Sequence, residues 1–105
     1  MATFVMAMNY HGPRPDLSQA LDERTGDVMR LLEASGGSLL AFYRTQGRFD
    51  ALAILEMPNA ETLQAFNLAN QSTDWTVETM RAFSTEEYPA IWSKAAALLK
   101  QAGGE

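Results

Sequence analysis

Four segments of the chain are rich in apolar residues and have the length of β-strands. They are Thr3 to Tyr10, Leu39 to Thr45, Phe49 to Met57 and Trp75 to Phe83. Residues typical of turns and loops follow them, as at His11-Gly12-Pro13 and Pro58-Asn59. Only Gln46-Gly47-Arg48 separates the second segment from the third, which predicts a hairpin with its bend at Gly47.

Three further segments repeat apolar residues at the spacing of an amphipathic helix. The first begins after Asp16, a residue that suits an N-cap, and ends at Gly36-Gly37. The second begins at Asn59, which also suits an N-cap. The third follows Ser84-Thr85-Glu86-Glu87, where the hydroxyl and the last carboxylate have the spacing of a capping box.

The order of these elements predicts the fold class. A β-α-β-β-α-β sequence with an added C-terminal helix is the ferredoxin-like α+β arrangement. It predicts a four-stranded antiparallel sheet, with the first and third strands at its centre and helices on one face. A length of 105 residues predicts one domain that spans residues 1–105.

The strand patterns predict that both faces of this sheet are apolar. In the first strand, Phe4, Met6 and Met8 alternate with Val5 and Ala7, and the third strand shows a similar pattern. A bare second face would expose a larger apolar patch than monomers usually carry. We therefore expect a second copy to pack sheet to sheet, which gives a dimeric α+β barrel, as a homodimer or within a higher homo-oligomer.

Charge and composition narrow the choice of partners and cofactors. The net charge is −5 and the chain has only 8 lysines and arginines, which argues against nucleic-acid binding. It has no cysteine, which fits a reducing cytoplasm and excludes thiolate chemistry. No apolar stretch reaches the length of a membrane span, so no membrane partner is expected. Because the chain also has a single histidine, we expect no metal and no cofactor.

At the hairpin bend, Gly47-Arg48-Phe49-Asp50 has the pattern of a glycine, one variable residue, an aromatic residue and an aspartate. This pattern resembles the motif of the GYD-domain family of small bacterial proteins, with Phe49 in place of the usual tyrosine. The resemblance continues through Ala53 to Pro58 and through Thr79 to Tyr88, and it includes the opening Met1 to Met6. It implies a dimeric α+β-barrel fold, in some members within larger assemblies. The family carries no generally established activity.

Three polar residues are candidates for proton transfer or electrostatic catalysis: Asp50, His11 and Arg81. Asp50 follows the hairpin bend and is either a general base or a hydrogen-bond acceptor for the hairpin backbone. His11 follows the first strand and is either an exposed residue or a proton carrier. Arg81 is expected either to form a structural ion pair or to capture a carboxylate of the ligand.

The candidate ligand-binding residues are Asn9, Tyr10, Arg44, Trp75 and Trp92. Loops at the ends of strands commonly line pockets, and several of these residues lie at predicted strand ends. Arg44 has the same two interpretations as Arg81, and across the hairpin its ion-pair partner would be Asp50 or Glu56. The tryptophans are equally suited to a core or an interface. The methionines, of which the chain has 6, suit an adaptable apolar cavity.

Three functional hypotheses follow. The first is a small oligomeric protein that binds a small organic ligand in an apolar cavity. The second is a cofactor-free enzyme of the dimeric α+β-barrel type, a monooxygenase or isomerase that uses proton transfer. The third is a purely structural assembly unit.

Overall fold

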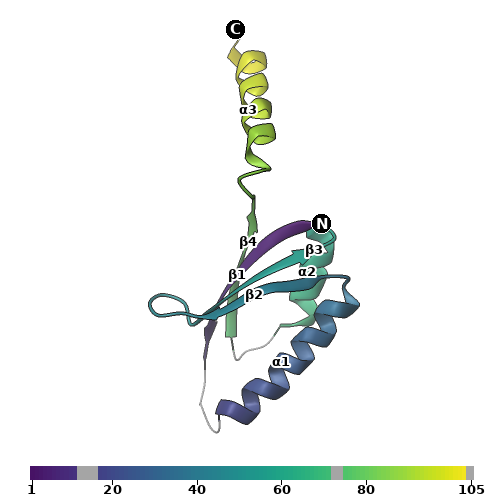
Figure 1. Ribbon diagram of the computed structural model, residues 1–105, viewed down its shortest axis with the longest axis vertical. Coiled ribbons are helices and arrows are strands. Elements are labelled where there is room, and N and C mark those ends of the chain that lie inside the picture. Colours follow the sequence, from purple (N-terminus) through teal and green to yellow (C-terminus); the bar gives the residue numbers. More distant parts are fainter. Residues whose placement is uncertain (12–16, 72–74, 104–105) are drawn as a thin grey trace.

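The computed structural model confirms the predicted ferredoxin-like α+β fold (Figure 1). It describes residues 1–11, 17–71 and 75–103, except for the side chains of residues 17–25. The elements in chain order are β1 (Ala2–Tyr10), α1 (Leu17–Ala34), β2 (Ser38–Arg44), β3 (Ala51–Met57), α2 (Ala60–Ala69), β4 (Trp75–Ala82) and α3 (Tyr88–Gly103).

The four strands form one antiparallel sheet in the order β2-β3-β1-β4, with the expected pair of strands at the centre. Val5 in the middle of β1 lies opposite Ile54 of β3 and opposite Met80 of β4. Because β1 pairs with β3 on one side and with β4 on the other, it sets the positions of both neighbours along the sheet.

The predicted helix caps are present where their residues are described. The side chain of Asn59 accepts a hydrogen bond of 2.7 Å from the backbone N–H of Thr62, so it caps α2. Ser84 and Glu87 form the reciprocal capping box, with bonds of 3.0 and 3.2 Å. The proposed N-cap at Asp16 lies outside the described residues.

The hairpin bend takes two residues that were expected to belong to the third strand. β3 begins at Ala51 because Asp50 serves the turn: the backbone N–H of Thr45 donates to the Asp50 carbonyl at 3.0 Å. Gly47 has φ +106°, a conformation that strongly favours glycine. The bend at Gly47 is thus confirmed.

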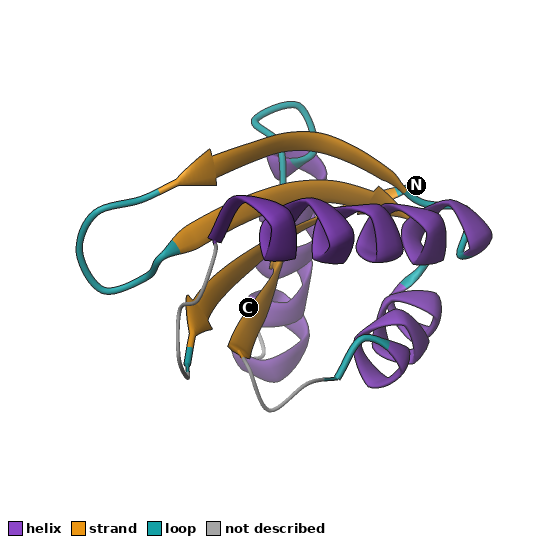
Figure 2. Ribbon diagram, turned by 90° about the horizontal axis from the view of Figure 1, so that it is seen from below, coloured by secondary structure: helices purple, strands orange, loops and turns teal. Residues whose placement is uncertain are grey.

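One face of the sheet is covered by α1 and α2, as predicted, and the core lies beneath them (Figure 2). Its buried side chains come from β1, β3 and the two helices: Phe4, Met6, Leu32, Ala53, Leu55, Met57, Leu63 and Phe66. Phe4 and Met6 face Leu55 and Ala53 across the central strand pair. The core therefore depends on alternate residues of the two middle strands.

The opposite face of the sheet, here called the open face, is apolar and has no helix over it in the described structure. Its central side chains, Val5, Leu52 and Ile54, are only partly buried. Tyr43 and Met80 towards its margins are exposed by 57% and 47%. The predicted apolar second face is thus present at its centre, and the register places Glu56 and Glu78 on the same face around it.

α3 does not join the other helices on the sheet. It continues outward from the end of β4, and the molecule is 62 Å long as a result (Figure 1). The radius of gyration is 17.5 Å, against about 13 Å for a compact chain of this length. No described residue of α3 is buried. Within the described parts of the chain, no helix is both long enough and apolar enough to cross a membrane.

Gly37 marks the closest approach between the end of α1 and the sheet. A Cβ placed there would lie 2.8 Å from the Glu56 carbonyl oxygen and 2.9 Å from a methyl carbon of Leu32. The backbone oxygen belongs to a central strand, so it cannot move without disturbing the ladder. The turn from α1 into β2 therefore requires glycine at this position.

We expect Gly37→Ala to lower the free energy of unfolding by about 1–3 kcal/mol, the usual cost of overpacking. The matched control is Gly26→Ala inside α1, where the one contact of the new Cβ with a described residue is with Arg30 at 3.6 Å. Replacing an unneeded helical glycine raises stability by up to about 1 kcal/mol. Urea denaturation followed by circular dichroism measures both, and equal effects of the two substitutions would contradict the assignment.

Candidate functional site

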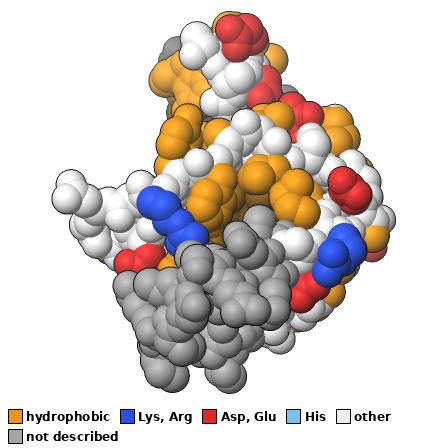
Figure 3. All heavy atoms as spheres, turned by 60° about the horizontal axis from the view of Figure 1, so that its bottom comes forward, with side chains coloured by type: hydrophobic (Ala, Val, Ile, Leu, Met, Phe, Trp, Pro, Cys, Tyr) orange, Lys and Arg blue, Asp and Glu red, His pale blue; other side chains and the backbone are white. Residues whose placement is uncertain are grey.

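A cavity of about 100 Å³ lies between α1 and the helix-covered face of the sheet. On the side of the molecule shown in Figure 3, apolar side chains gather around a hollow. The lining residues are Met6, Met8, Tyr10, Val28, Met29, Leu32, Leu39, Phe42, Arg44, Ala53, Leu55, Phe66, Asn70 and Trp75. Only a few of these side chains carry polar groups, so the described lining of the cavity is mostly apolar.

Three of the predicted ligand-binding residues line this cavity: Tyr10, Arg44 and Trp75. They come from three strands, and each lies at the same end of the sheet, where β1 and β2 end and β4 begins. Tyr10 is the last residue of β1 and lies opposite Trp75, the first residue of β4, while Arg44 is the last residue of β2. The antiparallel register thus brings together residues that are far apart in sequence.

The side chain of Arg44 is held by aromatic rings at the cavity margin. Its guanidinium carbon lies 5.5 Å from the ring centre of Tyr10 and 5.3 Å from that of Phe42, within the range of cation–π contacts. The expected ion pair with Asp50 or Glu56 is not formed. Glu56 lies opposite Ser38, at the other end of the β2–β3 pair from Arg44.

Asp50 and Asn9 tie the end of β1 to the hairpin. One carboxylate oxygen of Asp50 accepts from the backbone N–H of Tyr10 at 2.9 Å. The backbone N–H of Asp50 donates to the Asn9 side-chain oxygen at 3.1 Å and to the Met8 carbonyl at 2.9 Å. The Asp50 carboxylate therefore accepts from a backbone N–H of β1 and not from the hairpin backbone, as one of its two interpretations had it. Asn9 does not line the cavity.

His11 lies beside the same edge of the sheet but does not reach the cavity lining. Its Nε2 is 3.1 Å from the hydroxyl oxygen of Thr76, and the contact is exposed to solvent. Thr76 lies opposite Asn9 in the β1–β4 ladder, so its side chain belongs to the open face. The histidine and the cavity are thus on different sides of the sheet edge.

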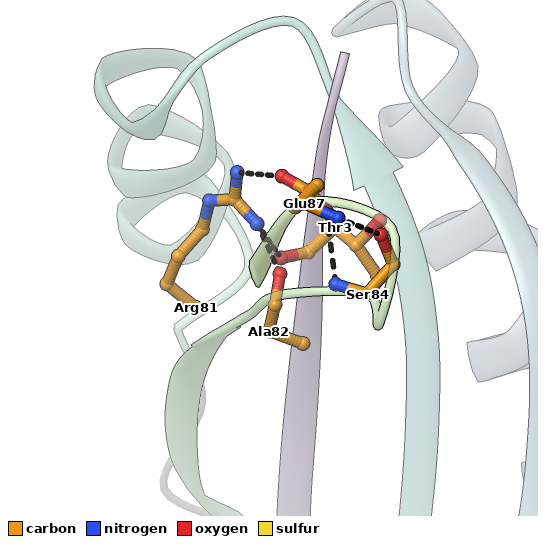
Figure 4. Close-up of polar contacts among 5 residues, drawn as sticks. All are labelled: Thr3, Arg81, Ala82, Ser84 and Glu87. Carbon is orange, nitrogen blue, oxygen red and sulfur yellow. Dashed lines mark hydrogen bonds and ion pairs between the residues drawn. The ribbon is translucent and has the colours of Figure 1, made fainter. Parts of the chain in front are cut away.

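Arg81 lies at the other end of β4, where it fixes the start of α3 (Figure 4). Its Nη1 donates to the carbonyl oxygens of Thr3, at 3.2 Å, and Ala82, and its Nη2 lies 3.3 Å from a carboxylate oxygen of Glu87. Six residues of extended strand, about 20 Å, separate it from Trp75. Within one chain Arg81 therefore cannot act together with His11 and Asp50. Trp92 on α3 does not line the cavity either.

Most lining residues were not predicted as site residues, among them Val28, Met29, Leu39 and Asn70. Val28 and Met29 lie on the apolar face of α1, and an apolar helix face looks the same in sequence whether it meets a core or a cavity. Asn70 is the C-cap of α2, where its backbone N–H donates to Phe66. Its position after the last apolar turn is the only sequence signal of that role.

The fold has counterparts among solved structures. A hypothetical protein from Pyrococcus horikoshii matches with a TM-score of 0.50 at 18% identity, over 80% of this chain and 92% of that one. A REP-associated tyrosine transposase, solved with a REP hairpin, matches with a TM-score of 0.51 at 12% identity, over 85% of this chain and 61% of that one. Identities this low show the fold alone, a ferredoxin-like α+β sheet.

The family follows from sequence. The GYD domain family model matches residues 4–92, which include most of β1, the other three strands and the hairpin bend. The chain therefore belongs to the GYD-domain family, as the resemblance implied. No curated protein matches its sequence.

The hydrogen bonds at the start of α3 predict how the capping interaction of Glu87 depends on pH. The backbone N–H of Ser84 and then the Arg81 guanidinium hold the pKa of Glu87 below its ordinary value. A lowered pKa means that the capping interaction is complete above the ordinary glutamate pKa, about 4.3, and is lost as pH falls through the lowered one. We expect NMR titration of the Glu87 carboxylate to show the lowered midpoint.

The Arg81→Gln substitution should raise that midpoint part of the way, because the Ser84 bond remains. Arg30→Gln, which removes an ion pair to Asp27 within α1, is the control and should leave it unchanged. A Glu87 midpoint at or above the ordinary value in the unsubstituted protein would contradict this account.

Proposed function

We propose that this GYD-domain protein is a small homo-oligomeric binding protein that holds a small organic ligand between α1 and the sheet. The observation that carries the proposal is the apolar cavity of about 100 Å³ with Tyr10, Arg44, Asn70 and Trp75 among its lining residues. Pockets of this composition, apolar with a few convergent polar groups, are the usual form of small-molecule sites.

The size and lining of the cavity favour an organic ligand over water. A buried water needs about 10–15 Å³ of such space and two to four polar partners. This cavity offers several times that volume, and most of its wall consists of methionine, leucine, valine and phenylalanine side chains. An apolar group would gain contacts along that wall that water cannot make.

The geometry favours binding over proton-transfer catalysis. Of the residues considered for catalysis, none lines the cavity. Asp50 bonds to the backbone of Tyr10, His11 to the Thr76 hydroxyl, and Arg81 to the start of α3. The enzyme hypothesis would need these groups to converge on one substrate.

Self-association is the second part of the proposal. The open face exposes Tyr43 and Met80 at its margins, and α3 exposes Trp92 and Leu99 by 67% and 73%. Burial of such apolar surfaces against a partner is favourable, because it removes them from water. In the proposed assembly a second copy packs against the open face, and the two copies form an isologous dimer. The absence of cysteine from the chain is compatible with a cytoplasmic location, which we also propose.

A cavity-filling substitution tests the binding site. Ala53 lines the cavity, and in Ala53→Leu the added carbons would occupy the space a ligand needs. We expect N-phenyl-1-naphthylamine, a neutral apolar dye, to bind the unsubstituted protein with enhanced fluorescence. Its affinity should fall about tenfold or more in Ala53→Leu, because several buried carbon contacts are lost.

Ala97→Leu on exposed α3 is the matched control and should not change dye binding. Thermal unfolding checks that both variants are folded. Dye affinity that is equal in the two variants would contradict the assigned cavity. Failure of the unsubstituted protein to bind would favour the structural assembly unit.

A charge on the open face tests self-association. Ile54 lies at its centre, opposite Val5 of β1 and Ala41 of β2. We expect light scattering to show an oligomer at micromolar concentration for the unsubstituted chain. In Ile54→Asp the affinity of the copies for one another should fall about a hundredfold or more, because a carboxylate would be buried in the interface without a partner.

The control is Leu68→Asp on α2, where the leucine is exposed by 58% away from the open face. It should leave the mass unchanged. A monomeric unsubstituted protein, or a loss of mass in Leu68→Asp alone, would show that the open face is not the interface.

A further inference from the structure

We infer that the ligand is an organic anion whose apolar body fills the cavity and whose acid group binds Arg44. This inference rests on the proposed binding function and adds the chemical class of the ligand. Arg44 is the one described residue of the lining that carries a full positive charge.

Within the described part of the chain, no carboxylate neutralises the charge of Arg44. The other described arginines each meet a carboxylate: Arg30 meets Asp27, Arg48 lies 3.6 Å from Glu78, and Arg81 lies 3.3 Å from Glu87. Among the described residues no carboxylate lies within ion-pair distance of Arg44. The nearest candidate along the hairpin, Asp50, bonds to the Tyr10 backbone instead.

Two aromatic rings orient the guanidinium of Arg44 at the cavity margin. Tyr10 and Phe42 place their rings within 5.5 Å of its guanidinium carbon, and both also line the cavity. Contacts with ring faces orient a guanidinium while leaving its N–H donors for another acceptor. A planar carboxylate, or another oxyanion, is the acceptor that matches those donors best.

Asn70, a second polar residue of the lining, lies at a less favourable position for an anion. Asn70 closes the C-terminal end of α2, where the helix dipole concentrates partial negative charge. An anionic group is therefore disfavoured at that position and favoured at Arg44. The electrostatics give the ligand one orientation, with its acid group on the β2 side of the cavity.

Two dyes of the same ring skeleton separate charge recognition from apolar binding. 8-Anilino-1-naphthalenesulfonate carries an anionic group that N-phenyl-1-naphthylamine lacks. In Arg44→Gln we expect the affinity for the sulfonate to fall about tenfold, because a charge-assisted hydrogen bond is lost. The affinity for the neutral dye should change less than about twofold, since its contacts are apolar.

Arg48→Gln is the matched control, because Arg48 lies on the same hairpin but outside the cavity lining. It should change neither affinity. Arg44→Lys keeps the charge without the planar fork and should retain part of the preference for the sulfonate. As a check on the carboxylate, 1-naphthoate should displace the sulfonate dye from the unsubstituted protein better than 1-naphthalenemethanol does.

The outcomes distinguish this inference from the function on which it rests. Binding of both dyes with no effect of Arg44→Gln on the sulfonate would overturn the inference and leave the cavity in place. Binding of neither dye to the unsubstituted protein would overturn the proposed function itself. An equal loss in Arg44→Gln and Arg48→Gln would show that only the overall charge matters, which also overturns the inference.

Discussion

The hydrogen-bonded position of β1 between β3 and β4 is the constraint on which the rest of this structure depends. Its antiparallel register with both neighbours places Tyr10 beside Trp75 and beside the hairpin end of β3. The same register places Arg81 at the opposite end of the sheet, beside Thr3. One end of the strands therefore borders the cavity, and the other end sets the direction of α3. Neither location is free to change unless β1 slips in register.

Most of the fold could be predicted because its signals are local. Apolar runs, the glycine at the hairpin bend, Asn59 and the Ser84–Glu87 capping box each act within a few residues, and the element order then specified the topology. The direction of α3 could not be predicted. A capping box shows where a helix begins, but the orientation here depends on Arg81 reaching the Thr3 carbonyl, 78 positions away in sequence.

The candidate site was only partly predictable for a related reason. Strand-end residues such as Tyr10, Arg44 and Trp75 were identified because ends of strands border pockets, and register brought them together. The helix side of the cavity was missed, since Met29 looks like any core residue in sequence. The expected ion pair of Arg44 was also wrong, because Asp50 bonds to the backbone of Tyr10 and Glu56 lies at the other end of the β2–β3 pair.

Methionines form part of the cavity wall, with Met6 and Met8 on β1 and Met29 on α1. Unbranched thioether side chains change rotamer at little cost and adapt to ligands of different outline. Such a wall would discriminate weakly between ligands of different shape. The selectivity of the proposed site would then depend on the few polar contacts at its margin. Oxidation of these thioethers to sulfoxides would make the wall polar and close it to apolar ligands. A ligand site with this wall would therefore tolerate differences in molecular shape and be sensitive to oxidants.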